Sequence, residues 1–273
     1  MNARVLLVLA LTLVGCFGGL DDDPILMLSS TEALEEGRGL LAQDKPKEAR
    51  PYFLHAFEVE PNSATGREGL LLASDSFFRS GGEANLIKAE ARYRDFVNRF
   101  PTSEHAAYAQ FQIGLSLARR VVKPDRDQSV SEQALVALDD VRRFYPTSTY
   151  AEQATVEMAL VRNRIAEHDY LVGRFYIRFG MPYSAIQRFE GILENYADYP
   201  DQDKVLFQLC RAHVKRGAPG DAALASGYCG RLERDFPESE FAGKISKPPP
   251  LPIEELEVDE EDDTSSESAD TGV

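Results

Sequence analysis

The sequence predicts an all-α fold, a superhelical solenoid of about five tetratricopeptide-like helical hairpins followed by a disordered C-terminal tail. Two observations lead to this prediction. A single residue pattern recurs five times, and each copy ends at or near a proline. The alternation of apolar and polar residues that is typical of strands is not sustained anywhere in the sequence. We expect the repeat domain to occupy residues 30–245.

Each copy of the pattern begins with an alanine, and its other marked positions, mostly large and apolar, follow 4, 7 and 11 residues later. These spacings place the side chains on one face of a helix. The alanine lets a neighbouring helix approach closely, and the larger residues fill the groove between the two helices. A proline at position 12, which four copies have, cannot continue the helix. The copies begin at Ala49, Ala89, Ala134, Ala185 and Ala225.

A serine two residues after four of these prolines predicts the start of the next helix, because its side chain can accept a hydrogen bond from the free N–H groups there. Helices that begin at the first three serines would carry a large apolar residue at +8 and a small one at +11. The serines are Ser63, Ser103, Ser148 and Ser239, the large residues Leu71, Phe111 and Val156, and the small ones Ser74, Gly114 and Ala159. Each repeat is therefore expected to be a helical hairpin, with a period longer than the roughly 34 residues of a standard tetratricopeptide repeat.

The N-terminus predicts export and lipidation. Residues 1–15 carry one positive side chain, Arg4, and then an apolar run too short to span a membrane, which needs about 20 residues. This pattern is typical of a signal peptide. The segment Leu13–Cys16 looks like a bacterial lipobox, so we expect lipidation at Cys16 and a lipidated linker over residues 16–29. A plain secretory signal that contains a cysteine is the alternative.

Two further cysteines, Cys210 and Cys229, lie in two expected antiparallel helices, Asp203–Arg216 and Asp221–Asp235. They are almost equally distant from the turn between these helices, so their side chains are expected to face each other within reach of disulfide geometry. Export would place them in an oxidising compartment, where disulfides persist. We expect a disulfide here, and two buried thiols are the alternative.

Residues 246–273 differ in composition from the repeats. A proline-rich segment over residues 247–252 is expected to form a stiff, extended spacer. Ten acidic residues and no basic ones follow between Glu254 and Asp270, so most of the net charge of −15 lies there. We expect a disordered, solubilising tail, and docking on a basic surface is the alternative. The acidic balance argues against nucleic acid as a partner.

No catalytic or metal-binding motif is recognisable in the sequence. None of the four histidines stands at metal-ligand spacing, and each is expected at the surface or at an interface. The sequence therefore favours a protein that is not an enzyme and uses no cofactor or metal. Stacked hairpins form a surface suited to holding polypeptides. Phe78, Tyr108 and Phe111 are candidates for a peptide groove on it, although core packing explains them at least as well.

Four blocks of the repeat region resemble the BamD family, lipoproteins of the β-barrel assembly machinery. Phe144–Ala151 resembles the F-Y-P-x-S-x-Y-A block of that family, and Asp125–Gln128 is similar to its D-R-D segment. His105–Leu115 resembles the junction between its second and third repeats, and Arg188–Gly191 resembles the R-x-E-G helix of its fourth repeat. The resemblance extends over residues 30–242, in order and with similar spacing.

This resemblance implies five tetratricopeptide-like repeats, lipid-anchored on the periplasmic face of the cell outer membrane. It implies binding to the periplasmic domains of the barrel-forming outer-membrane assembly protein, and help in delivering and inserting unfolded outer-membrane proteins. The C-terminal repeats would dock the barrel-forming subunit through Arg188, which matches the family's docking arginine, with Glu190 beside it. The N-terminal repeats would receive substrate signals.

Two other functions stay open at this point. A repeat lipoprotein of similar architecture could be a pilotin-like factor for secretin or pilus assembly. A regulator of a cell-envelope enzyme is a third reading, which a polar cluster in the groove would support. The chain departs from the family pattern near the C-terminal repeats, in a small insertion, Ala197–Tyr199, in the cysteine pair and in the Pro-rich and acidic tail.

Overall fold

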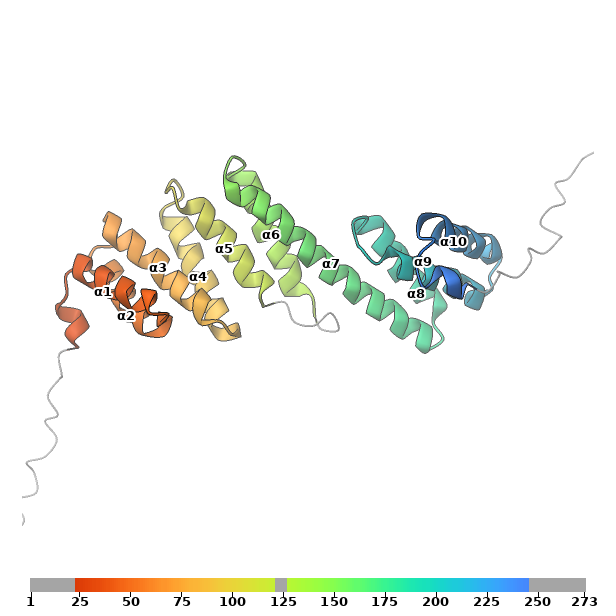
Figure 1. The fold of residues 1–273 in the computed structure, drawn as a ribbon, viewed down its shortest axis with the longest axis horizontal. Coiled ribbons are helices and arrows are strands. Elements are labelled where there is room, and N and C mark those ends of the chain that lie inside the picture. Colours follow the sequence, from red (N-terminus) through yellow and green to blue (C-terminus); the bar gives the residue numbers. More distant parts are fainter. Residues whose placement is uncertain (1–22, 121–126, 246–273) are drawn as a thin grey trace, which may run out of the picture. The chain divides into compact units, whose positions relative to one another are not determined.

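The computed structural model describes residues 23–120 and 127–245 (Figure 1). The predicted signal peptide, Cys16, most of the linker, Asp125–Arg126 and the tail over residues 246–273 lie outside the described residues. Over the described ranges the chain forms helices and no strand. The elements are η1 (Pro24–Met27), α1 (Ser30–Ala42), α2 (Pro46–Val59), α3 (Ala64–Ser80), α4 (Glu83–Arg99), α5 (Ala106–Ala118), α6 (Ser129–Phe144), α7 (Thr149–Arg178), α8 (Pro182–Asn195), α9 (Gln202–Arg216), α10 (Asp221–Asp235) and η2 (Ala242–Lys244).

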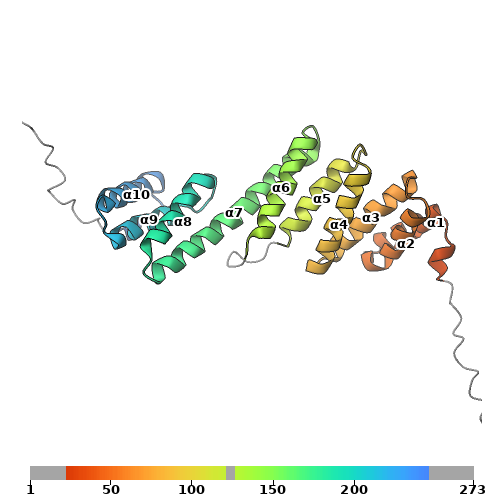
Figure 2. The same ribbon diagram turned by 180° about the vertical axis from the view of Figure 1, so that it is seen from behind.

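The chain divides into two compact units. Unit 1 comprises the described residues up to Val161 in α7 except Asp127, and unit 2 comprises Asp127 and the chain from Arg162 onward. In unit 1, α1 to α6 pack in chain order, each against the next (Figures 1 and 2). In unit 2, α8 packs on α9 and α9 on α10. The predicted all-α repeat fold is confirmed.

The five alanines that begin the repeat pattern are all fully buried, and they lie on α2, α4, α6, α8 and α10. The residues four positions later are also buried, and so are those seven positions later. The residue eleven positions later caps the helix in every copy, with φ between −137° and −129° and ψ between 52° and 67°. The pattern therefore marks the second helix of each hairpin.

The fourth copy shows that the proline is not needed to end the helix. Ala197 stands where the other copies have proline, yet α8 ends with the same cap geometry at Tyr196, whose N–H donates to the carbonyl of Ile192. The inserted residues instead bring Tyr199 into the core, where it is buried with Tyr170 and Phe189. The insertion thus adds an aromatic side chain to the interior of unit 2.

Only some of the serines that follow the prolines stand at the start of an α-helix. Ser63 caps α3 as predicted, because its Oγ accepts a hydrogen bond of 2.9 Å from the N–H of Gly66. Ser148 immediately precedes α7. Ser103 is not the cap of α5, which begins three residues later, and Ser239 precedes only the short η2. At these two positions the serine Oγ accepts from the N–H two residues ahead and stabilises a turn.

One close contact recurs between the two helices of the hairpins. A Cβ atom at Gly37, Gly114 or Gly173 would lie 2.5 Å from the side chain of the residue four positions after the repeat alanine. These facing side chains are Phe53, Leu138 and Phe189. In these three hairpins the first helix has a residue without a side chain where the second helix carries a bulky one.

The prediction for the first half of α7 was wrong. Val156 is 59% exposed and Ala159 only half-buried, whereas Ala154 and Val161 are fully buried. Val156 stands two residues from Ala154 and so points to the other side of the helix. Counting from Ser148 also failed because α7 has 30 residues, and its glycine contact falls at Gly173.

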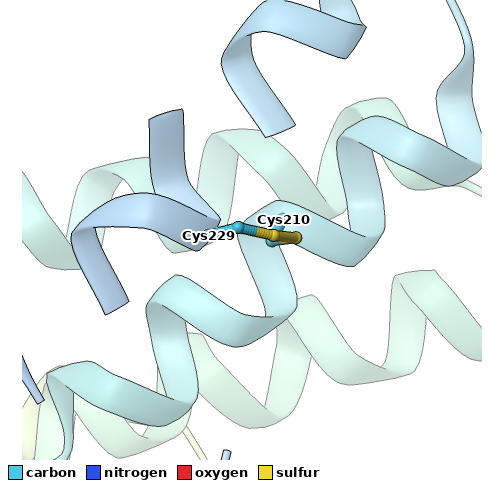
Figure 3. Close-up of a disulfide and its surroundings, with 2 residues drawn as sticks. All are labelled: Cys210 and Cys229. Carbon is cyan, nitrogen blue, oxygen red and sulfur yellow. A yellow bond between two sulfur atoms is a disulfide. The ribbon is translucent and has the colours of Figure 1, made fainter. Parts of the chain in front are cut away.

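Cys210 on α9 and Cys229 on α10 form a disulfide, with 5.4 Å between their Cα atoms (Figure 3). The two helices have nearly the bounds expected from the sequence. Cys229 stands four residues after Ala225, at the position that Phe53, Leu138 and Phe189 hold in other copies. The fifth hairpin therefore has a covalent link where other hairpins have a glycine facing a large side chain.

The glycine contact predicts opposite effects for one substitution at two sites. Gly39→Ala on α1 has open space for its Cβ and should stabilise unit 1 by up to about 1 kcal/mol, because glycine is a poor helix former. Gly114→Ala should lower the free energy of unfolding by about 1–3 kcal/mol, because its Cβ would overlap Leu138. Denaturant unfolding of both variants measures the two effects, and a stabilised Gly114→Ala protein would contradict the packing scheme.

The disulfide closes a loop between residues 19 apart in sequence. Cross-linking a loop of this size stabilises a fold by about 3 kcal/mol, mainly by restricting the unfolded chain. The double variant Cys210→Ala, Cys229→Ala should therefore unfold in unit 2 at lower denaturant concentration than the parent. A reducing agent should weaken the parent and leave the double variant unchanged, which separates the effect of the bond from that of the side chains.

Candidate partner-binding surfaces

Arg188 lies on the surface of α8 and is oriented by α7. Its Nη1 donates a hydrogen bond of 2.9 Å to Oδ1 of Asp169, and its side chain is 49% exposed. Phe189, the next residue, is fully buried against Tyr170, so the helix that carries Arg188 is fixed by the core. An arginine held by one carboxylate keeps further N–H donors for a partner. This geometry suits recognition of a carboxylate on another protein.

Glu190 does not share a surface with Arg188. Two residues along a helix point in different directions, and Glu190 turns toward α9 and α10. Its Oε1 accepts a hydrogen bond of 3.1 Å from the hydroxyl of Tyr228 and lies 3.9 Å from Nε2 of His213. Burial is the main cause that raises the pKa of Tyr228 to about 12, and the neighbouring Glu190 carboxylate acts in the same direction. Glu190 therefore joins helices inside unit 2.

His213 and Asp221 form a buried polar centre at the turn between α9 and α10. Nδ1 of His213 lies 2.7 Å from Oδ1 of Asp221. The other carboxylate oxygen, Oδ2, accepts hydrogen bonds of 2.7 Å from Nε of Arg216 and from the N–H of Ala218. The Arg216 guanidinium holds the pKa of Asp221 well below its usual range. His213 was expected at a surface or an interface, but it is buried. The Asp221 carboxylate satisfies Nδ1 of its ring, whereas Nε2 has no hydrogen-bond partner among the described residues.

The inserted Tyr199 takes part in a second polar centre, which joins α7 to the start of α9. Nζ of Lys204 donates to Glu167 and to Asp201, each at 2.7 Å, and the hydroxyl of Tyr199 also bonds Glu167. Burial opposes the charge of Lys204, but the hydrogen bonds to Asp201 and Glu167 raise its pKa above its ordinary value. These contacts fix α7 beside Asp169, the residue that orients Arg188.

The three aromatics predicted to line a peptide groove are packed in unit 1. Phe78 and Phe111 are buried, Phe78 beneath the guanidinium of Arg119 and Phe111 beside Tyr150. The hydroxyl of Tyr108 donates a hydrogen bond of 2.8 Å to Asp75. Phe78 and Phe111 therefore belong to the core, whereas Tyr108 is only partly buried. Their helical spacing could not distinguish a groove from a core. The candidate binding site of unit 1 lies elsewhere.

Asp75 accepts two hydrogen bonds on the inner face of α3. The hydroxyl of Tyr93 donates to its Oδ1 at 2.6 Å, and that of Tyr108 donates to the same oxygen. Burial raises the pKa of Asp75 above its ordinary value, although the two hydrogen bonds act in the opposite direction. The carboxylate thus joins α3, α4 and α5 at some electrostatic cost.

A cleft of about 540 Å³ opens in unit 1 between the start of α3 and the end of α4. Its lining includes the arginines Arg67 and Arg99, the ring of Phe100 above the buried Phe96, and the acidic residues Glu68 and Glu104. The Arg67 guanidinium lies 5.7 Å from the centre of the Phe100 ring, and Nε of Arg99 donates to Asp95 at 2.6 Å. A cleft of this volume can take an apolar side chain and a carboxylate of a bound peptide. The only sequence feature that marks the position of this cleft is the Phe100-Pro101 end of the second repeat.

Within the described parts of the chain, no group of three or more histidine, cysteine, aspartate or glutamate side chains is placed to hold a metal ion. None of the helices described is both long enough and apolar enough to cross a membrane.

Buried alanines, glycine contacts and a common cap geometry define a tetratricopeptide-type repeat protein. Residues 29–228 match the family described as YfiO, outer membrane lipoprotein. Since this match covers most of the chain, the protein belongs to that family, whose curated relatives carry the name outer membrane protein assembly factor BamD.

Two of these relatives show the extent of the similarity. The BamD of Caulobacter vibrioides is 28% identical over 74% of this chain and 64% of its own length. The BamD of Rickettsia prowazekii is 27% identical over 86% of this chain and 91% of its own length. Among solved structures, the yeast Sti1 TPR2AB domain covers 78% of this chain at 12% identity, with 80% of its own length matched and a TM-score of 0.42.

The raised pKa of Asp75 predicts how stability depends on pH. Between the ordinary pKa of a carboxyl and the raised value, the unfolded chain has lost this proton while the folded chain retains it, so the free energy of unfolding falls as pH rises through this window. Asp75→Asn keeps an acceptor for the tyrosines and should remove that fall. The decrease amounts to about 1.4 kcal/mol for each unit by which the pKa is raised.

Denaturant unfolding from pH 4 to pH 7 measures the difference between parent and variant. Asp139→Asn, on the exposed face of α6, is the matched control and should follow the parent. Parallel curves for the parent and Asp75→Asn would show that burial of this carboxylate has no effect on stability.

Proposed function

We propose that this protein is a lipid-anchored lipoprotein on the periplasmic face of the outer membrane that acts in β-barrel assembly. It binds the periplasmic domains of the barrel-forming subunit and helps to deliver and insert unfolded outer-membrane proteins. Membership of a family whose relatives are named assembly factors carries this proposal. The lipobox at Leu13–Cys16 supports it, since acylation of Cys16 would hold the repeats at the membrane surface.

The contact with the barrel-forming subunit is proposed at Arg188 of unit 2. Three observations support this position: the guanidinium is half-exposed, Asp169 holds it in one orientation, and the helix beneath it is fixed by Phe189. A preoriented arginine loses less conformational freedom on binding than a free one. Glu190 contributes indirectly, through its hydrogen bond with Tyr228.

The binding of unfolded clients is proposed at the cleft of unit 1. Its two arginines and the ring of Phe100 offer charge and apolar contact to the same short peptide segment, beside the carboxylates of Glu68 and Glu104. Such a site would tolerate many sequences, because it reads an apolar side chain and a carboxylate, two features that many client polypeptides share.

Reversal of the charge at Arg188 tests the docking site. Arg188→Glu should lower capture of the barrel-forming subunit from detergent-solubilised membranes at least tenfold, because it removes a charge-assisted contact worth about 1.5–3 kcal/mol. Arg231→Glu is the matched control, since Arg231 is 42% exposed and pairs with Asp235 on its own helix. Helical circular dichroism should stay unchanged in both variants. Equal capture by both would remove Arg188 from the interface, and recovery of a secretin by the parent would replace the proposed function.

The cleft is tested by photo-cross-linking to a denatured outer-membrane β-barrel protein diluted out of urea. A photoreactive amino acid at Thr102, on the rim of the cleft, should give an adduct that Arg67→Glu and Arg99→Glu together reduce several-fold. Arg142→Glu and Arg143→Glu on α6 make the same charge change away from the cleft and should leave the adduct intact. An adduct at Thr102 that the cleft variants do not reduce would contradict this assignment.

A further inference from the structure

Unit 2 presents an exposed apolar surface where α7 ends and α8 begins. We call it the aromatic patch and define it by Phe175, Phe179, Met181 and Tyr183, which are all exposed. The rings of Phe175 and Phe179 lie 4.4 Å apart and are 51% and 60% exposed. Large apolar side chains gathered in this way on a surface mark a contact site.

Cationic side chains border the aromatic patch. Arg174 and Arg178 lie on the last turns of α7, and no described residue forms an ion pair with either. Lys215, near the end of α9, donates from Nζ to the carbonyl of Ile177 at 2.8 Å, which brings a third positive charge to the end of α7. The Arg216 guanidinium is 5.9 Å from the centre of the Tyr183 ring, and its charge is paired with Asp221. A ligand of this surface must therefore be both apolar and acidic.

One segment of this chain has that chemistry. Between Ile253 and Val258 the sequence interleaves three apolar residues with Glu254, Glu255 and Glu257. Five consecutive acidic residues, at positions 259–263, follow directly. The segment complements the patch in both apolar character and charge.

The spacer before this segment has the length needed to reach the patch. The described chain ends beside the start of α9, where Oγ of Ser239 bonds Asp203 and Phe241 lies against Phe207. The patch lies at the opposite end of α9, whose 15 residues span about 22 Å. The seven residues 246–252, four of them proline, span about 22 Å when extended. The spacer would thus deliver Ile253 to the end of α9 that carries Lys215.

We propose that the acidic segment Ile253–Asp263 docks in cis on the aromatic patch of unit 2. Ile253, Leu256 and Val258 cover the exposed rings, and the carboxylates face Arg174, Arg178 and Lys215. A short tether gives an effective concentration in the millimolar range, so an intrinsic affinity of that order suffices for occupancy. The acidic tail thereby acts as a cover for an apolar surface, a role independent of the proposed function in barrel assembly.

Carbodiimide cross-linking of the full-length chain tests the docking directly, because it joins a carboxylate to an amine in contact. Mass spectrometry should find Lys215 joined to Glu254, Glu255 or Glu257. Cross-linking a mixture of ¹⁴N-labelled and ¹⁵N-labelled protein shows whether the tail and Lys215 come from the same molecule. Docking in cis gives only cross-linked peptide pairs in which both peptides carry the same isotope. Cross-links of mixed isotope composition would show instead that the patch binds the tail of a second copy, and would overturn the proposal.

Two sets of variants keep the cross-linking chemistry and alter only the apolar contact. Phe175→Ser with Phe179→Ser changes the patch, and Ile253→Ser with Leu256→Ser and Val258→Ser changes the tail; each should lower the yield at Lys215 at least threefold. Val136→Ser, an exposed valine on α6, should leave it unchanged. Lys244, next to the tail, should cross-link in every variant and reports that the tail stays reactive. A Lys215 yield that both variant sets leave unchanged, or no Lys215 cross-link in the parent, would overturn the proposal.

Discussion

In three of the hairpins, the distance between the two helices depends on a contact between a glycine on the first helix and a large side chain on the second. Where the second helix carries Phe53, Leu138 or Phe189, the first helix has a glycine, and a Cβ there would enter the space of the facing side chain. Protein interiors are packed as densely as organic crystals, so such an overlap cannot be absorbed without moving a helix. The alanine four residues before each bulky side chain keeps the rest of the helix face close.

The same contact explains how the fifth hairpin differs from the others. Cys229 occupies the bulky position but is a small residue, so it fills less of the space between the helices than an aromatic ring does. Its disulfide with Cys210 holds α9 and α10 together covalently. The turn between these helices is held as well, by the carboxylate of Asp221, which accepts from Arg216 and from the N–H of Ala218. The last hairpin therefore relies on covalent and polar contacts more than the others do.

The candidate binding residues depend on this frame in different ways. Arg188 is exposed because its neighbour Phe189 faces the core, and it is oriented because Asp169 lies on the adjacent turn of α7. Lys204, Glu167 and the inserted Tyr199 hold α7 in that place. Arg188, which the family resemblance indicates for docking, is thus supported in part by Tyr199, a residue of this chain's own insertion.

The sequence alone determined the helices that carry the repeat pattern, because alanine, bulky residue and cap recur at spacings that a helix places on one face. It also determined the facing cysteines, since equal distances from a turn put two residues of antiparallel helices at one height. Only the tertiary structure decided which aromatics are buried, since Phe78, Tyr108 and Phe111 have the same spacing whether they line a groove or a core. It also decided that Glu190 contacts Tyr228 and His213, and it formed the cleft at Arg67 and Arg99. These contacts depend on which helices meet in the fold, and the spacing within one helix does not give that information.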